Sequence, residues 1–465
     1  MRRIVVVGAG ISGLAAAWAA RQAADQMPEG LEVLVLERDV EVGGKARSMV
    51  RGDWLMEGGP AGFLGGRSEM DGLIDGAGLR DALVPADPEA ARRYLYRAGR
   101  LRRVVSNPIG FLRSGILSGG GFARMLAEPF VPVRREGPDE SVWSFAARRL
   151  GAEVADRLMM PMTLGIFAGD AKRLSVAAAF PRMVALEREH GSIVRGLLAR
   201  RGRTSSGTLT SFRGGMQQLP RALAARGGFT VRCNATVRAL LGTPTGWNVV
   251  VDGDPEPVPA DAVILAGEPW ASAQLLRGRH ALLANDLDGI YCPPVSVVAL
   301  GFGPSARRSM PRGFGVLIAR GEGYRMLGNL WETDSYPGRG PKDHLLVRAM
   351  YGGAVDPEAG DLDESELLAL ARVEMARFYG VSEPPLFASA VRVPRAIPQY
   401  ELGHGDRLAR IDQALAALPG VYLTGFGLRG VAFADAAADG TRQGARAAAA
   451  LVRSAVGGST SEFAR

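Results

Sequence analysis

One short segment is the strongest indication of the fold: Ile4-Val5-Val6-Val7-Gly8-Ala9-Gly10-Ile11-Ser12-Gly13. Its first four residues are β-branched and predict a buried strand, which the glycine turn ends. The Ala-rich segment 14–24 then predicts a helix, and 31–36 predicts a second strand with the acid Glu37 directly after it. Strand, glycine turn, helix, strand and acid together are typical of a Rossmann-type βαβ unit that binds a dinucleotide.

The three glycines of the turn have different expected roles. Gly8 allows the tight turn, Gly10 lets the backbone approach a pyrophosphate, and Gly13 lets the helix pack closely on the sheet. The phosphates would lie at the positive end of the helix dipole. Glu37 would accept hydrogen bonds from ribose hydroxyls, and the predicted site also includes Ser12 and Arg38.

A second glycine pattern follows the acid. Gly43-Gly44-Lys45 precedes Arg47-Ser48, and Glu57-Gly58-Gly59-Pro60 comes soon after. This pattern resembles the superfamily of flavin amine oxidases, phytoene desaturases and protoporphyrinogen oxidases. The resemblance implies non-covalent FAD. It implies that Gly43, Gly44 and Lys45 run beside the pyrophosphate and ribose, that Gly58, Gly59 and Pro60 lie near the isoalloxazine ring, and that the backbone of Val237 meets the adenine.

The C-terminal part carries a third glycine pattern, Gly425-Phe426-Gly427, after an expected strand at 421–424. By the same resemblance, Gly425, Val431, Ala432 and Phe433 would present backbone N–H groups to the flavin and its ribityl chain. Phe426 departs from the family pattern, in which an acid or Asn often follows the glycine, so one contact there is in doubt.

No second glycine motif for a nicotinamide cofactor is found. The sequence Gly301-Phe302-Gly303 continues into Pro304 and basic residues and does not open an apolar helix. We therefore interpret it as the end of a strand. Reduced flavin would then be reoxidised by oxygen or another acceptor, which favours an oxidase.

Longer stretches resemble the protoporphyrinogen oxidase family, over nearly the whole chain. They include 88–101, Gly165–Ser175, 212–216, 313–317 and 397–404. The resemblance implies oxidation of protoporphyrinogen IX to protoporphyrin IX in haem biosynthesis: six electrons leave in three hydride transfers to flavin N5, and oxygen becomes hydrogen peroxide. The cofactor does this chemistry, so no catalytic side chain and no metal are expected. The implied substrate-binding residues are Arg93, which would hold a propionate, Gly169, Leu317 and Trp331.

Three alternatives stay open. The same fold and flavin could oxidise coproporphyrinogen III to coproporphyrin III, and extra basic residues at the pocket mouth would favour that substrate. A flavin amine or carotenoid oxidase is a more distant alternative, because an amine would need an aromatic cage beside the flavin. A non-catalytic flavin-binding subunit is the alternative from another class.

The expected fold class is α/β. A Rossmann-type FAD-binding domain would be assembled from three chain segments, 1–84, 205–275 and 390–457. Residues 85–204 would form a helical membrane-binding domain, because they combine apolar faces with a basic excess. Residues 276–389 would form an α+β substrate-binding domain, and the polar tail 458–465 would be disordered.

Composition limits the cellular context. The net charge is +8, with 56 Lys and Arg against 48 Asp and Glu. The sequence has no aromatic–basic interleaving or zinc spacing, so this charge does not favour nucleic acid. It suits an anionic lipid surface or substrate, or an ordinary solvated surface of an Arg-rich sequence. The two cysteines, Cys233 and Cys292, indicate a reducing compartment. We expect a cytoplasmic protein with peripheral contact to the inner membrane, and a homodimer is left open.

Overall fold

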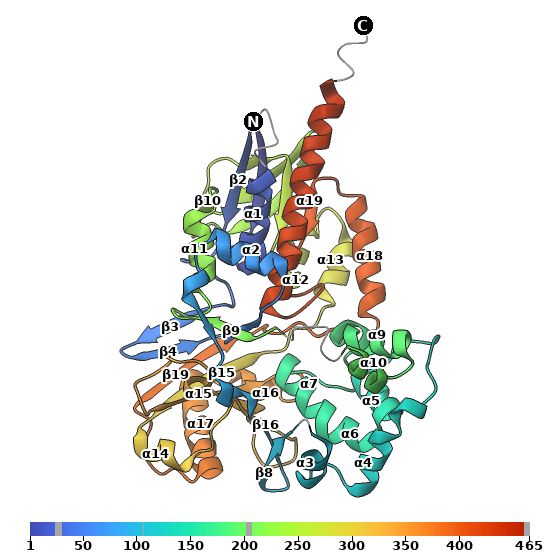
Figure 1. The fold of residues 1–465 in the computed structure, drawn as a ribbon. Coiled ribbons are helices and arrows are strands. Elements are labelled where there is room, and N and C mark those ends of the chain that lie inside the picture. The colour runs from blue at the N-terminus through green and yellow to red at the C-terminus, as the bar shows by residue number, and fades with distance from the viewer. Residues whose placement is uncertain (24–29, 106, 201–206, 460–465) are drawn as a thin grey trace.

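The computed structural model describes residues 1–23, 30–105, 107–200 and 207–459 (Figure 1). The central element is a parallel sheet of five strands whose members come from distant parts of the chain. Ile4, Val5 and Val6 in its middle strand have no exposed surface, as expected for parallel strands covered on both faces. In spatial order the strands are β10 (Thr230–Arg232), β2 (Leu31–Leu36), β1 (Arg2–Val7), β14 (Ala262–Leu265) and β20 (Val421–Leu423).

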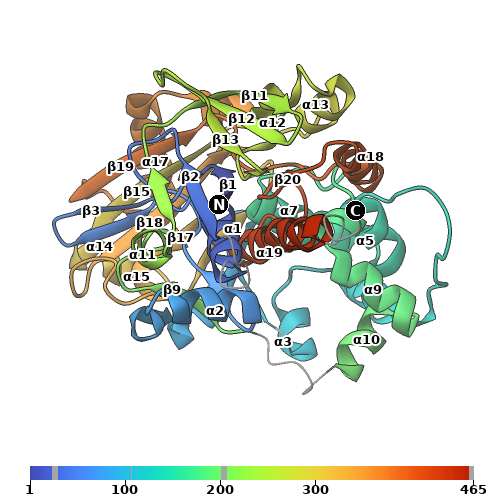
Figure 2. The ribbon, with the colours of Figure 1, turned by 90° about the horizontal axis from the view of Figure 1, so that it is seen from above.

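Helices α1 (Ile11–Ala23) and α19 (Phe433–Ser459) lie side by side on one face of this sheet (Figures 1 and 2). A Cβ on Gly440 would stand 2.1 Å from the Ser12 carbonyl oxygen, and one on Gly444 would stand 2.0 Å from that of Ala16. The two glycines, one helical turn apart, therefore let the helix backbones touch. The same face also holds α2 (Ser68–Gly76) and α11 (Gln218–Arg226).

The opposite face is covered by an antiparallel meander and three helices that share a second apolar core. The meander consists of β11 (Val237–Thr243), β12 (Gly246–Val251) and β13 (Val258–Ala260), and the three helices are α12 (Pro269–Leu276), α13 (Ala281–Asp288) and α18 (His404–Ala416). After the N-terminal unit, the chain forms two small sheets. One small sheet pairs β3 (Ser48–Arg51) with β4 (Trp54–Glu57), and the other contains β5 (Phe63–Leu64), β9 (Leu209–Phe212) and β6 (Leu83–Pro85), the last preceded by η2 (Arg80–Ala82).

A mixed sheet of seven strands forms the lower left part of Figure 1. Only its β16–β7 pair is parallel. The sheet packs on α17 (Glu364–Tyr379) through a third core. Its order is β19 (Phe387–Val393), β15 (Val295–Phe302), β18 (Leu345–Gly352), β17 (Gly328–Trp331), β16 (Gly315–Ile318), β7 (Arg93–Arg97) and β8 (Arg100–Val104), and the nearby helices are η3 (Pro88–Ala91), α14 (Pro304–Ser309), α15 (Glu332–Ser335) and α16 (Pro357–Asp361).

The β7–β8 hairpin lies within 85–204, the segment expected to form a helical domain, but it consists of two strands. The side chains of β7 point to alternate faces of the sheet. Tyr94 and Tyr96 pack on the α17 side, whereas Leu95 packs against the helical part. This period of two is the pattern of a strand between two apolar layers. The hairpin therefore belongs to the seven-stranded sheet, as does all of β19, whose last four residues lie beyond the expected boundary at 389. The other domain boundaries remain predictions.

The helical part lies at the lower right of Figure 1. Ser192 and Ser141 begin two of its helices by accepting hydrogen bonds from the third backbone N–H, the usual N-cap arrangement. Its elements are α3 (Pro108–Arg113), α4 (Gly119–Leu126), η4 (Glu128–Phe130), α5 (Val142–Leu150), α6 (Ala152–Val154), the π-helical turn η5 (Ala155–Met159), α7 (Met160–Phe167), α8 (Val176–Ala179), α9 (Pro181–His190) and α10 (Ile193–Ala199).

Two further expectations concern membranes and the C-terminus. Within the described ranges, no helix is both long and apolar enough to cross a bilayer. Helix α19 includes residues 458 and 459, which were expected in the disordered tail. Residues 460–465, the rest of that tail, lie outside the described residues.

Candidate cofactor and substrate sites

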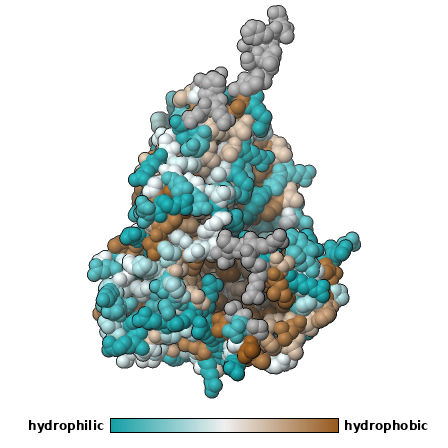
Figure 3. Space-filling view, in the orientation of Figure 1, coloured by the Kyte–Doolittle hydropathy of each residue, from teal (hydrophilic) through white to brown (hydrophobic). Residues whose placement is uncertain are grey.

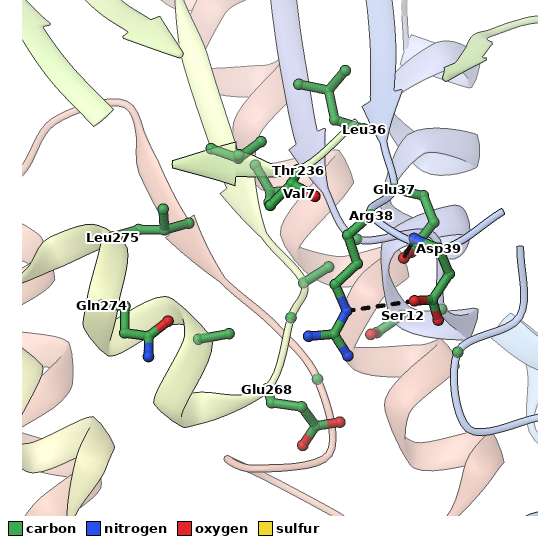
Figure 4. A pocket seen from close by; sticks show the side chains of 18 of the residues that line it. Val7, Ser12, Leu36, Glu37, Arg38, Asp39, Thr236, Glu268, Gln274 and Leu275 are labelled. Carbon is green, nitrogen blue, oxygen red and sulfur yellow. Dashed lines mark hydrogen bonds and ion pairs between the residues drawn. The ribbon is translucent and has the colours of Figure 1, made fainter. Parts of the chain in front are cut away.

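A cavity of about 380 Å³ opens at the carboxyl ends of β1 and β2 (Figure 4). This is the place where open α/β sheets bind their ligands. The cavity brings together residues from the start, the middle and the end of the chain. The predicted cofactor residues that line it are Gly8, Gly10, Ser12, Glu37, Arg38, Gly44, Lys45, Val237 and Gly425.

The three turn glycines occupy three different environments. Gly8 has a φ of +106°, which an L side chain rarely adopts. A Cβ on Gly13 would stand 1.9 Å from the carbonyl oxygen of Gly8, so the helix could not approach the turn. A Cβ on Gly10 would meet no protein atom within 4 Å, although Gly10 lines the cavity. The space beside Gly10 therefore suits a ligand that approaches the backbone closely.

Glu37 is 7% exposed and is held in place by backbone groups. Its Oε2 accepts a hydrogen bond of 2.6 Å from the Ala9 N–H, and its Oε1 accepts one of 3.0 Å from the Asp39 N–H. Each carboxylate oxygen can accept a further bond. Arg38 extends into the cavity, with its Nε 3.6 Å from Asp39 (Figure 4). The site can thus offer both an acceptor and a cation to a nucleotide.

The wall opposite the glycine turn comes from α12 and was not predicted. Glu268 and Trp270 line the cavity, and both the second carboxylate oxygen of Glu268 and the indole Nε1 of Trp270 are buried without a partner in the described structure. Buried polar atoms without a partner are costly, so they fit a polar ligand. The sequence did contain a signal, because Gly267 and Pro269 after strand β14 mark a second strand-to-helix turn.

Lys45 lies at the inner end of this cavity. Its Nζ is 2.8 Å from Oε1 of Glu268 and donates a hydrogen bond to the Ala396 carbonyl. It also lies 5.9 Å from the ring centre of Phe426. Lys45 therefore fixes the point at which the nucleotide cavity meets the segment around Ala396.

Several predicted cofactor residues do not line the nucleotide cavity. Gly58 donates to the Arg47 carbonyl at 2.8 Å, and a Cβ on Gly59 would stand 2.0 Å from the Lys45 carbonyl. These two glycines bring their segment into contact with 45–47. The side chain of Phe433 is 3% exposed and packs in the core beside Phe63. The predicted residues outside the cavity lining are Gly13, Gly43, Gly58, Gly59, Pro60, Val431, Ala432 and Phe433.

Val431 and Ala432 instead line a separate cavity at the N-terminus of α19, also of about 380 Å³. A helix N-terminus leaves backbone N–H groups without partners inside the helix. The role of Val431 and Ala432 in binding the flavin stays a prediction. Tyr400 and His404 also line this cavity, with their rings stacked 4.2 Å apart. Burial lowers the pKa of His404, so the imidazole is neutral near pH 7.

A further cavity of about 210 Å³ lies between the helical part and the seven-stranded sheet, and Gly169 lines it. Leu164 also lines this cavity and shares an apolar cluster with Ala396, whose carbonyl accepts the Lys45 hydrogen bond. Two cationic side chains in its lining were not predicted, Arg97 and Arg320.

The three other predicted substrate residues have different positions. Arg93 is exposed on β7, and its guanidinium lies 5.1 Å from the ring centre of Phe314. Leu317, opposite Leu95 in the sheet, faces Gly165 of α7. Trp331 has no exposed surface, and its Nε1 donates to the Tyr379 hydroxyl at 2.7 Å. It therefore packs between the sheet and α17 and lines none of the cavities described above.

Within the described ranges, no group of three or more His, Cys, Asp and Glu side chains could hold a metal ion. Cys292 is buried, and burial raises the pKa of its thiol to about 11. The thiolate is the reactive form of cysteine, so this residue is inert at neutral pH.

The parallel sheet, the glycine turn and the cavity at its carboxyl edge define a dinucleotide-binding protein of the Rossmann class. The family model described as "Flavin containing amine oxidoreductase" matches residues 11–452. The chain therefore belongs to this family, and it is a flavin-dependent oxidoreductase with a mixed α/β fold.

Curated relatives narrow the family further. The chain is 32% identical to the protoporphyrinogen oxidase of Bos taurus, with 96% of this chain and 98% of that protein covered. It is 30% identical to the chloroplastic protoporphyrinogen oxidase of Nicotiana tabacum, over 92% and 82%. It is also 27% identical to the coproporphyrinogen III oxidase of Bacillus subtilis, over 93% and 95%.

Solved structures share the fold. A crystal structure from Exiguobacterium sp., named as a candidate protoporphyrinogen oxidase, superposes with a TM-score of 0.84 at 23% identity and covers 96% of this chain and 98% of its own. Putrescine oxidase bound to putrescine reaches a TM-score of 0.66 at 20% identity, over 97% and 99%. One architecture thus serves flavoproteins with different substrates.

Proposed function

We propose that this protein binds FAD non-covalently and oxidises a porphyrinogen to the corresponding porphyrin in haem biosynthesis. The observation that carries the proposal is that contacts link the two cavities: Lys45 of the nucleotide cavity donates to the Ala396 carbonyl, and Ala396 shares an apolar cluster with Leu164 of the cavity at Gly169. The names of the relatives support the same reaction.

When bound, FAD would supply the acceptor for hydride. Each porphyrinogen would lose six electrons and six protons in three steps, and three molecules of oxygen would become three of hydrogen peroxide. The chain's own residues would bind and orient. Gly10 would leave room for the pyrophosphate, Glu37 would accept from the ribose, and the cavity at Gly169 would keep water from the reacting carbon.

Two substrates are supported. Protoporphyrinogen IX is favoured by the relatives named protoporphyrinogen oxidase, and coproporphyrinogen III by the Bacillus subtilis relative. The test is aerobic turnover of both, measured as porphyrin fluorescence and as peroxide. Three peroxides per porphyrin would support the proposal, and no porphyrin from either substrate would refute it.

Acid precipitation should release all FAD, whereas flavin left on the chain would contradict non-covalent binding.

Arg93 is proposed to bind a propionate at the exposed end of β7. Arg93→Ala should raise KM more than it lowers kcat, because the contact lies far from the carbon that loses hydride. A charge-assisted bond at an exposed mouth implies a fall of about ten- to a hundredfold in kcat/KM. Arg93→Lys should restore only part, since a point charge cannot form the bidentate fork. Steady-state kinetics with each porphyrinogen measures both changes.

Arg92 is the matched control for Arg93. It already pairs with Glu89 at 2.5 Å, so Arg92→Ala should leave the porphyrinogen kinetics near those of the unchanged protein. FAD content and melting temperature should be normal in both variants. If Arg93→Ala has normal kinetics as well, another cation holds the propionate.

The helical part is proposed to dock on an anionic membrane from the cytoplasmic side. Apolar side chains are exposed on α3, α4, η4 and α10, and Phe130 is 83% exposed. In Figure 3, brown atoms gather around a hollow and over this lower right part. The exposed apolar residues are Ile109, Leu112, Leu126, Phe130, Leu197 and Leu198. Peripheral docking would shorten the transfer of poorly soluble substrate and product.

Vesicle flotation tests this docking. The protein should bind vesicles with anionic lipid at low salt, and binding should weaken as salt rises. Phe130→Asp should reduce binding severalfold, because it places a charge in the acyl boundary. Leu282→Asp, at an exposed leucine of α13, is the control and should bind normally. Equal binding by the two variants would exclude the helical part as the docking surface.

A further inference from the structure

The cavity at Gly169 has two walls of different chemistry. The helical wall contributes Met160, Pro161 and Leu164, which are apolar. The sheet wall contributes Arg97 from the end of β7 and Arg320 from just after β16. A flat apolar molecule in this slot would therefore meet two cations at one of its edges.

Arg320 is only weakly engaged by its acidic neighbour. Asp356 accepts from Arg325 through both carboxylate oxygens, at 2.7 and 3.1 Å. The guanidinium of Arg320 stands 3.9 Å from the same carboxylate and donates one long hydrogen bond, 3.4 Å, to the Val355 carbonyl. Since Arg325 satisfies Asp356, Arg320 can turn to an external carboxylate at little cost.

Two carboxylates also line the cavity, but they belong to the opposite wall. Asp156 accepts a hydrogen bond of 2.8 Å from the indole of Trp143, and Asp170 accepts one of 2.8 Å from the backbone N–H of Lys172. Neither forms an ion pair with Arg97 or Arg320 in the described structure. The positive groups of the cavity are thus segregated on the sheet side.

Arg97 and Arg93 lie on the same face of β7. Leu95 between them faces the helical part, and side chains two residues apart in a strand point to the same side. Arg93 and Arg97 are four steps apart along the strand, so their Cα atoms lie about 13 Å apart. The strand therefore presents a cation at each end of one apolar face, with Leu95 and its neighbour Leu317 in the middle.

We propose that Arg97 and Arg320 form a second carboxylate subsite that makes this protein prefer a porphyrinogen with carboxylates on two opposite edges, namely coproporphyrinogen III. This proposal rests on the proposed porphyrinogen oxidation. Protoporphyrinogen IX carries propionates on one edge and vinyl groups on the other. It would satisfy Arg93 and leave the second subsite facing apolar groups. Coproporphyrinogen III, with propionates in place of the vinyls, satisfies both ends, and a charged donor left unpaired in an apolar slot disfavours the wrong substrate.

The test compares the two substrates in matched variants. Kinetics of coproporphyrinogen III and protoporphyrinogen IX are measured for the unchanged protein, Arg97→Gln, Arg320→Gln and the double variant. The ratio of the two kcat/KM values should favour coproporphyrinogen III in the unchanged protein and should fall about ten- to a hundredfold in the double variant. The change should come mainly from KM for coproporphyrinogen III. Arg103→Gln is the control, because Arg103 pairs with Tyr94 across the hairpin and so faces the other side of the sheet.

The possible outcomes distinguish failure of the proposed subsite from failure of the proposed reaction. If the unchanged protein oxidises neither porphyrinogen, the proposed function fails and the subsite fails with it. If it oxidises porphyrinogens but the ratio is the same in the double variant, only the subsite is wrong. An equal loss for both substrates, with normal FAD content and melting temperature, also overturns the subsite, because it would mean a general role in substrate binding.

Discussion

Gly10→Val protein should fold but should purify without flavin colour. The side chain would enter the space beside Gly10 that no protein atom occupies within 4 Å, so the fold would not be strained while the ligand would lose its closest approach to the backbone. We expect FAD affinity to fall at least about a hundredfold, which corresponds to about 2.7 kcal/mol. Fluorescence titration of the apoprotein with FAD measures this loss, and circular dichroism checks the fold.

Gly13→Ala is the matched comparison. Its Cβ would stand 1.9 Å from the Gly8 carbonyl oxygen, so this change should lower the melting temperature and not only the FAD content. The two variants thus distinguish a loss of room for the ligand, at Gly10, from a loss of room for helix packing, at Gly13. A Gly10→Val protein that binds FAD with normal affinity would show that the pyrophosphate lies elsewhere.

Loss of the buried ion pair in the helical part should have the largest effect on stability. The side chains of Arg149 and Glu128 have no exposed surface and form an ion pair. Arg149 also donates to the carbonyls of Val131 at 2.8 Å and Gly191 at 3.1 Å. Arg149→Met would leave a buried carboxylate without its charged partner, which costs about 3–5 kcal/mol. Urea denaturation measures the free energy of unfolding, and Arg221→Met at an exposed pair with Glu41 should change little.

The same pair predicts a pH dependence. Burial raises the pKa of Glu128, but hydrogen bonds from Ser192, the Ile193 amide and Arg149 outweigh it, so the pKa lies below its ordinary value of 4.5. A carboxyl with a lowered folded-state pKa stabilises the fold above the unfolded-state pKa and loses that contribution as pH falls. Stability should therefore decline below pH 4.5. Glu128→Gln should be less stable at pH 7 and should show a shallower decline, and an unchanged decline would assign the acid sensitivity to other groups.

The first βαβ unit could be predicted because its signals are local. The run from Ile4 to Gly13 and the position of Glu37 set strand, turn and helix within a short stretch of chain, and the structure has β1, α1 and β2 there. The Glu268–Trp270 wall of the nucleotide cavity was missed because Gly267 and Pro269 mark only a strand-to-helix turn. That this turn lies beside the first glycine turn follows from the pairing of β14 with β1, which is a long-range contact.

The positions of the substrate residues were harder to predict from the sequence. Trp331 was expected in the pocket, but side chains in a strand alternate between faces, and a shift of one residue moves a side chain to the other side of the sheet. Leu317 faces the helical part while Trp331 faces α17. Arg97 and Arg320 stand in an Arg-rich sequence, and only the pairing of β7 with β16 brings them to one cavity.

The central claim is that a porphyrinogen reduces the flavin of this protein. The most direct measurement is anaerobic titration of the FAD-loaded protein with protoporphyrinogen IX, with coproporphyrinogen III and, as a control, with putrescine, followed by the visible absorbance of the flavin. We expect both porphyrinogens to bleach the flavin, with three flavins reduced per porphyrinogen and coproporphyrinogen III acting faster, while putrescine leaves the flavin oxidised. Flavin that stays oxidised with both porphyrinogens would show that this protein is not a porphyrinogen oxidase.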